Sequence, residues 1–154
     1  MTMIEIPTAV HRGDDELPWV DIGDGSLLKV LHIKEREGLW VIRNRFSPGY
    51  RVQTHKHTGP VFAYTESGAW RYLESDFVNT AGSYLYEPAG SVHTLVVPEE
   101  NTEPTDVFFA INGANLNLDA NGNVESVYDA TLILQSYYLM CEAAGLPRPP
   151  VVID

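Results

Sequence analysis

The sequence is poor in cysteine, in basic side chains and in long apolar runs. Cys141 is the single cysteine among 154 residues, which excludes an internal disulfide and a thiolate metal cluster and favours a reducing compartment. Ten basic residues against 21 acidic ones give a net charge of -11, which repels nucleic acid and anionic lipid. No segment approaches the roughly 18 apolar residues that a membrane span needs, and no basic head with an apolar stretch marks the N-terminus. We therefore expect a soluble, cytoplasmic protein that binds neither nucleic acids nor membranes.

The middle of the chain alternates between apolar and polar residues, as strands with one buried face do. The length and the hydrophobic content of 44% suit one globular domain over residues 1–154. Asn121-Gly122 predicts a two-residue hairpin, because both residues tolerate positive φ. The expected strands are 27–34, 39–46, 61–65, 69–73, 83–86, 94–97 and 107–111.

Near the C-terminus the pattern takes the period of a helix. Apolar residues recur at helical spacing over 130–144, with Asp129 as a candidate N-cap and Gly145 as a stop signal. About eight to ten short strands and one late helix predict an all-β fold, a jelly-roll β-barrel with one C-terminal helix. The expected parts are an N-terminal arm over 1–20, a barrel over about 21–128, a helix over about 129–145 and a tail over 146–154. Arm and tail could wrap a partner, and we expect a homodimer or homotetramer.

Two histidines one residue apart, His55 and His57, indicate a metal site. On a strand, positions i and i+2 share a face with their Cα atoms about 6.5–7 Å apart. Two imidazoles so placed can reach one ion at roughly 2.1 Å each. A histidine without such a neighbour is more often a surface or hydrogen-bonded residue, and we expect that of His11 and His32. Because His-x-His alone is weak evidence, the surrounding residues decide its meaning.

Glycines, a proline and a third histidine surround this pair at regular spacing. The spaced positions are Gly49, His55, His57, Val61, Gly68, Gly82, Pro88, Gly90 and His93. This spacing resembles the two cupin motifs, in which two histidines of the first motif and one of the second bind a metal inside a small barrel. The resemblance implies that His55, His57 and His93 are the metal ligands. Pro88-Ala89-Gly90 suits the tight turn that would lead into the strand of His93.

The carboxylate that most cupins place beside these histidines is missing from its motif position, where Val61 stands. Neither Pro60 nor Phe62 replaces it, so we expect three histidines with open positions for water, substrate and oxygen. Three neutral imidazoles leave the charge of a divalent ion uncompensated, which favours an anionic chelate such as the enolate of a β-diketone or α-hydroxyketone. Imidazole ligands suit iron(II), which also reacts with dioxygen, while zinc, nickel, copper and manganese stay open.

Strand alternation predicts which side chains surround the ion. If the ligating histidines face the barrel interior, every second residue along their strands faces it too. The expected apolar substrate pocket consists of Val61, Ala63, Trp70, Leu95 and Val97. The candidates for a catalytic contact with substrate, which lead into the second motif, are Tyr84, Tyr86 and Glu87.

Three longer stretches, which read HTGPVFAYTESGAWRYLE, NTAGSYLYEPAGSVHTLVVPEEN and TDVFFAINGANLNLDANGNVESVYDA, extend the comparison. They resemble the 2,4'-dihydroxyacetophenone dioxygenase family, a branch of the cupins related to the ChrR-type cupin domains, over roughly residues 10–150. The resemblance implies a non-haem iron held by His55, His57 and His93. It also implies oxygen-dependent cleavage of a carbon–carbon bond in an aromatic α-hydroxyketone. Acetylacetone-cleaving cupins, which this chain also resembles in its three histidines, imply an aliphatic diketone instead.

Two other classes of function stay open. A metal-dependent isomerase, lyase or hydrolase would need no oxygen. A sensor or binding module would hold zinc in the same site and have no activity.

Overall fold

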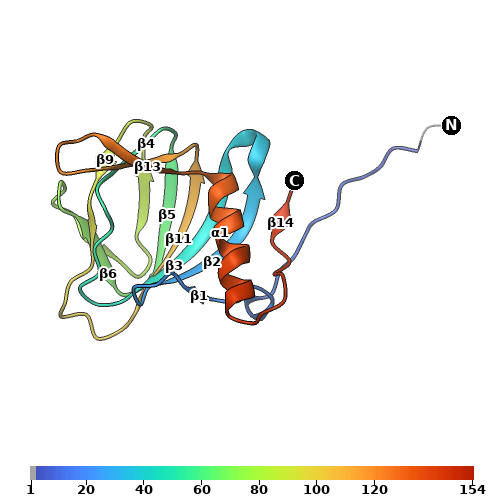
Figure 1. Ribbon diagram of the computed structural model, residues 1–154, viewed down its shortest axis with the longest axis horizontal. Helices are drawn as coiled ribbons and strands as arrows, with labels where there is room; N and C mark the ends of the chain where they lie inside the picture. The colour runs from blue at the N-terminus through green and yellow to red at the C-terminus, as the bar shows by residue number, and fades with distance from the viewer. Residues whose placement is uncertain (1–2) are drawn as a thin grey trace.

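The computed structural model describes residues 3–154. Within them, strands with one buried face close into a barrel (Figure 1). The largest sheet contains, in spatial order, β1 (Val20–Asp21), β2 (Leu27–Lys34), β3 (Leu39–Phe46), β11 (Thr105–Asn112), β5 (Val61–Ser67) and β8 (Tyr84–Glu87). A four-stranded sheet has the order β13 (Val124–Tyr128), β12 (Asn115–Leu118), β4 (His55–His57) and β9 (Val92–His93). A third sheet has the order β10 (Leu95–Val96), β6 (Ala69–Tyr72) and β7 (Asn79–Thr80).

One α-helix, α1 (Ala130–Ala143), packs beside the barrel against β1, β2 and β3 (Figure 1). Its N-cap is Asp129, whose Oδ1 accepts a hydrogen bond from the Leu132 N–H at 2.9 Å, as the sequence predicts. The helix buries Leu134, Tyr137 and Cys141 against the sheet. The predicted all-β fold with a single C-terminal helix is therefore confirmed. No helix in residues 3–154 is long and apolar enough to cross a membrane.

Two hairpin connections have local structure of their own. β2 and β3 pair as an antiparallel hairpin, and Glu35–Glu37 between them forms a short 3-10 helix, η2. The hairpin predicted at Asn121-Gly122 is confirmed, because β12 pairs antiparallel with β13. Its two-residue loop is wrong, since β12 ends at Leu118 and β13 begins at Val124. The longer connection is stabilised by the Asp119 carboxylate, which accepts hydrogen bonds from the backbone N–H groups of residues 121 and 123 at 2.9 Å each.

The two ends of the chain behave differently. The C-terminal tail packs on its own barrel, where β14 (Val152–Ile153) pairs in parallel with β2. The carboxylate of Asp154 lies 2.6 Å from Nε2 of His32. The N-terminal residues 3–11 extend away from the body (Figure 1). A second short 3-10 helix, η1 (Asp14–Glu16), then leads into β1.

Gly68 forms the tight turn between β5 and β6 at φ 79°. A Cβ atom at this position would lie 2.6 Å from Cα and 2.9 Å from Cβ of Thr105. Gly82 also has a positive φ, of 88°, but a Cβ atom there would meet nothing within 4 Å. The two glycines thus share the backbone constraint, and only Gly68 adds a steric one.

We expect Gly82→Ala to lower the free energy of unfolding by about 1–2 kcal/mol, the typical strain of a left-handed backbone. Gly68→Ala should cost about 2 kcal/mol more, because the added methyl overlaps the Thr105 backbone. Urea denaturation of both variants beside the wild type measures the difference. Equal losses for the two variants would contradict the steric role of Gly68.

Candidate metal centre

The four-stranded sheet brings the three predicted histidines together. His55 and His57 lie on the buried face of β4, and His55 is the direct cross-strand partner of His93 on β9. Their ring centroids are 4.7 Å apart for His55 and His57, 5.6 Å for His57 and His93, and 6.4 Å for His55 and His93. The turn before β9 is tied to β4 by a hydrogen bond of 2.7 Å from the Gly90 N–H to the His57 carbonyl.

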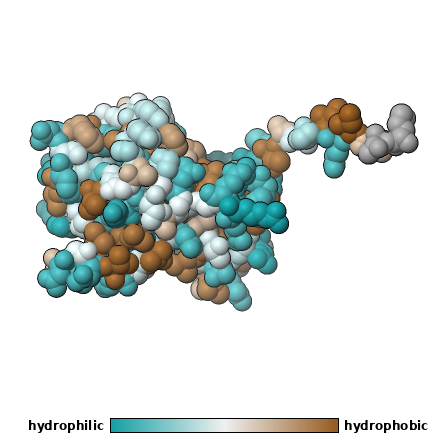
Figure 2. All heavy atoms as spheres, turned by 90° about the horizontal axis from the view of Figure 1, so that it is seen from above, coloured by the Kyte–Doolittle hydropathy of each residue, from teal (hydrophilic) through white to brown (hydrophobic). Residues whose placement is uncertain are grey.

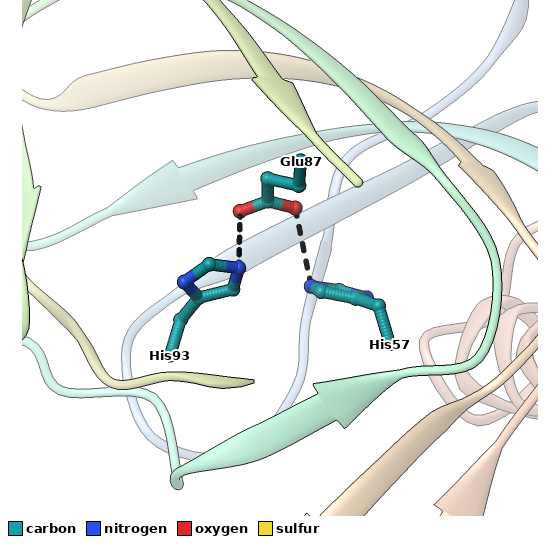
Figure 3. Close-up of side chains that lie close together, drawn as sticks. All are labelled: His57, Glu87 and His93. Carbon is teal, nitrogen blue, oxygen red and sulfur yellow. Dashed lines mark ion pairs between the residues drawn. The ribbon is translucent and has the colours of Figure 1, made fainter. Parts of the chain in front are cut away.

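A carboxylate lies beside these histidines, which differs from the expected site of three histidines alone. Glu87 on β8 is 2% exposed, with Oε2 3.1 Å from Nε2 of His57 and Oε1 3.5 Å from Nε2 of His93 (Figure 3). Glu87 is the direct cross-strand partner of Val61. Because such partners project from the same face of a sheet, the carboxylate enters the site from the neighbouring strand.

Five buried polar atoms of this group have no hydrogen-bond partner. These atoms are both ring nitrogens of His57, both carboxylate oxygens of Glu87 and Nε2 of His93. Buried polar groups are nearly always bonded, so their convergence without bonds indicates a ligand between them. Two donors at about 2.1 Å from one ion, separated by 90–109°, lie roughly 3.0–3.4 Å apart. The distances from Glu87 to the two histidines agree with that geometry, so these residues fit a divalent metal ion.

His55 lies beside this group but is not one of the three residues whose ligand atoms lie within 4.8 Å of one another, which are His57, Glu87 and His93. Nδ1 of His55 donates to the carbonyl oxygen of Gln53 at 2.8 Å, because a carbonyl only accepts. Nε2 is therefore the nitrogen left for a metal. Burial lowers the pKa of His55 and of His93 below the ordinary histidine value, so both are neutral at pH 7. The Tyr72 ring stacks on His93, with centroids 4.1 Å apart and planes at 16°.

The histidines His55 and His57, together with Glu87, face a cavity of about 770 Å³ that reaches helix α1. Cavities of a few hundred to about 1,000 Å³ hold small organic ligands. The largest sheet supplies an apolar wall made of Leu28, Trp40, Ile42, Phe46, Phe109 and Ile111. Helix α1 contributes Ile133, Ser136, Leu139 and Met140.

The predicted pocket residues divide between this cavity and the core. Leu95 lines the cavity. Val61, Ala63, Trp70 and Val97 are buried but are not among its lining residues, which corrects their expected place. Trp70, for example, donates from Nε1 to Oγ1 of Thr65 at 2.9 Å inside the core. Inward orientation therefore holds for all five residues, but most of them pack against other side chains.

Tyr84 and Tyr86 lie on the opposite face of β8 from Glu87. They are 65% and 54% exposed, and neither lines the cavity. Alternation on β8 turns Leu85 and Glu87 inward and the two tyrosines outward. This placement corrects the expectation that Tyr84 or Tyr86 makes a catalytic contact with bound substrate.

Two asparagines of β12, which the sequence reasoning missed, line the cavity beside the histidines. Asn115 is the cross-strand partner of His57, and Asn117 is that of His55. The Oδ1 atom of Asn115 is buried without a hydrogen-bond partner. The sequence feature that could have identified them is the alternation in NLNL, which places two amides on one face of a strand. The four-stranded sheet thus presents polar groups to the cavity, opposite the apolar wall.

A jelly-roll barrel with histidines of two strands converging inside it defines the class of the cupins. Within that class the chain belongs to the ChrR cupin-like domain family, whose model matches residues 8–113. The comparison with curated proteins finds no match.

Solved structures share the fold over different lengths. A protein of unknown function with a cupin-like fold from Ralstonia eutropha is 30% identical, with 99% of this chain and 96% of that chain covered and a TM-score of 0.88. An acetylacetone dioxygenase from Acinetobacter johnsonii is 16% identical, with 91% and 97% covered and a TM-score of 0.74. The complex of SigE with the anti-sigma ChrR from Rhodobacter sphaeroides is 19% identical, with 65% and 51% covered and a TM-score of 0.53. The last two show the fold alone.

We expect the protein to bind one equivalent of a divalent ion and His57→Ala to weaken that binding by at least about 100-fold, because an imidazole ligand is lost. Metal titration of the apo-protein, followed by elemental analysis, measures both quantities. His32→Ala is the matched control, since His32 pairs with Asp154 on the outside of the barrel. Equal metal affinity of the two variants would exclude the site.

Proposed function

We propose that this protein is a non-haem iron(II) dioxygenase that cleaves a carbon–carbon bond of an α-hydroxyketone or β-diketone. The observation that carries the proposal is the group of His57, Glu87 and His93, with the His55 ring beside it, at a largely apolar cavity. A divalent ion in this site would acidify a chelating ketone and, as iron(II), would also bind dioxygen. The chain's own residues then have to orient the ketone, accept its proton and exclude water.

In this proposal Glu87 accepts the proton. Its two oxygens are buried and have no hydrogen-bond donor, so a proton on either oxygen displaces no existing bond. The carboxylate also changes the charge argument, because an ionised Glu87 offsets one of the two charges of the ion. A Glu87 carboxyl that accepted the substrate proton would be neutral, and the deprotonated ketone would carry the negative charge in its place. The site therefore favours proton transfer to Glu87 over binding of a second anion.

The cavity walls would orient the substrate. The apolar wall of the largest sheet suits the carbon skeleton of a ketone, which loses little by leaving water. On the opposite wall, Asn115 offers an amide beside His57 with one buried end unbonded. The oxygen and nitrogen of an amide are assigned from its neighbours, so Asn115 can present an N–H to a substrate oxygen.

Two likenesses support this choice of substrate class. The sequence stretches around both motifs resemble the 2,4'-dihydroxyacetophenone dioxygenase family. The acetylacetone dioxygenase from Acinetobacter johnsonii has the same fold over nearly its whole length. The first favours an aromatic α-hydroxyketone and the second an aliphatic β-diketone, so both belong in an activity test.

We expect protein reconstituted with iron(II) without oxygen to consume oxygen when it is then mixed with a hydroxyacetophenone or a β-diketone. His93→Ala should lower that rate by at least about 1,000-fold, since removal of a catalytic metal or its ligand abolishes its contribution to the barrier. An oxygen electrode measures the rate, and His32→Ala serves as the control. No uptake with any ketone by iron-loaded wild type would contradict the proposal.

Glu87→Gln tests the role of the carboxylate separately. We expect iron to stay bound, because three imidazoles remain, while turnover falls by about 10²–10⁴-fold, the usual contribution of a general base. Iron content and oxygen uptake are measured on the same preparation. Loss of iron together with activity would instead make Glu87 a required ligand.

The carboxylate also favours a second candidate, a zinc-binding sensor or an oxygen-independent enzyme. His57, Glu87 and His93 provide three donors close together, and His55 as a fourth ligand would complete a tetrahedral zinc set. Elemental analysis of protein purified without added metal separates the candidates. Stoichiometric zinc without oxygen uptake selects the sensor, and turnover that persists without oxygen selects an isomerase, lyase or hydrolase.

A further inference from the structure

The N-terminal arm, residues 3–11, is an apolar segment that its own barrel leaves uncovered. Every residue of the arm is exposed, and Met3, Ile4, Ile6 and Val10 are between 62% and 90% exposed. Figure 2 shows the arm leaving the body with hydrophobic side chains along it. Ile4 and Ile6 are two residues apart, so they share one face of an extended segment. Apolar residues at this exposure favour contact with another surface.

The root of the arm, residues 12–14, is held against the body of the protein by several contacts. Nε of Arg12 donates to the carbonyl oxygen of Pro150 at 2.5 Å. The Asp14 carboxylate lies 3.0 Å from Nζ of the buried Lys29 and 3.1 Å from an Arg43 nitrogen. Lys29 also donates to the Asp14 carbonyl oxygen at 2.6 Å. These contacts hold residues 12–14 against the sheet.

A second uncovered surface lies on the outer face of β5 and β8. Phe62 pairs directly with Tyr86, and Tyr64 pairs with Tyr84. The four rings, which we call the aromatic face, are 38–65% exposed, and the Phe62 and Tyr86 centroids are 5.6 Å apart. β8 is the last strand of its sheet and pairs with β5 alone among the described residues. Exposed tyrosines and phenylalanines are typical of protein interfaces.

The charge and size of these surfaces suit a second copy of the chain. Two copies that each carry a net charge of -11 repel one another, so a stable contact needs uncharged surfaces. The aromatic face has no charged residue, and residues 3–10 contain one, Glu5. Four rings at about half exposure offer about 400 Å². A two-fold contact that uses face and arm twice reaches about 1,600 Å², the standard size of a specific interface.

The length of the arm allows this arrangement. Nine extended residues span up to about 30 Å, which is enough to cross onto a neighbouring barrel. We infer that residues 3–11 pack on the aromatic face of a second copy, so that the protein is a two-fold dimer with exchanged arms.

Light scattering coupled to gel filtration tests the dimer. We expect the wild type to be a dimer at micromolar concentration, and both Ile4→Asp with Ile6→Asp and Tyr84→Ser with Tyr86→Ser to weaken the dimer by at least 100-fold. Circular dichroism shows whether each variant is folded. The matched control is Val124→Asp on the other exposed edge strand, β13, at a residue 54% exposed, and it should stay dimeric. A monomeric wild type, or loss of the dimer in Val124→Asp alone, overturns the inference.

Disulfide linkage tests which surfaces meet, since Cys141 is buried and the chain has no other cysteine. Ile6→Cys protein mixed with Tyr86→Cys protein should form a covalent heterodimer under mild oxidation that a reductant reverses. Ile6→Cys mixed with Val124→Cys should not. No linkage to Tyr86→Cys or to Tyr84→Cys, with the dimer intact, places the arm elsewhere and overturns the inference.

Discussion

The register between neighbouring strands is the constraint on which the site depends. His55 faces His93 across β4 and β9, His57 faces Asn115 across β4 and β12, and Glu87 faces Val61 across β8 and β5. A slip of one residue in any of these pairs would turn a side chain from the interior to the outside. The turns that fix the register therefore matter to the chemistry as much as the ligands do. Gly68 limits how the β5–β6 turn can pack against Thr105.

The charge states of the site residues depend on their burial. Burial keeps His55 and His93 neutral by lowering the pKa of each, which is the state in which an imidazole binds a metal. Glu87 is the single carboxylate in direct reach of the imidazoles among residues 3–154, and its oxygens have no other donor. A buried charge without a donor is costly unless a cation compensates it. A bound cation would therefore offset the cost of burying the Glu87 carboxylate.

The sequence predicted the parts of the site that depend on spacing along one strand and missed those that depend on pairing. The shared face of His55 and His57 follows from the two-residue period of a strand. The bounds of β2 and β3 follow from their unbroken alternation, and α1 follows from its helical spacing and the cap at Asp129. The sequence indicates Glu87 as a candidate residue but does not predict its position beside the histidines, because it does not show that β8 pairs with β5. Asn115 was missed for the same reason, since the sequence does not show that β12 pairs with β4. Tyr84 and Tyr86 lie on the opposite face of the strand from Glu87, but the sequence does not show which of the two faces points inward.

Because β14 pairs with β2, the last residues form part of the largest sheet. Asp154 contacts His32, and the strand before it lies parallel to the second strand of the sheet. A purification tag fused after Asp154 would therefore begin at a residue that is engaged in the fold. Removal of the last few residues would expose the backbone of an otherwise covered strand to aggregation.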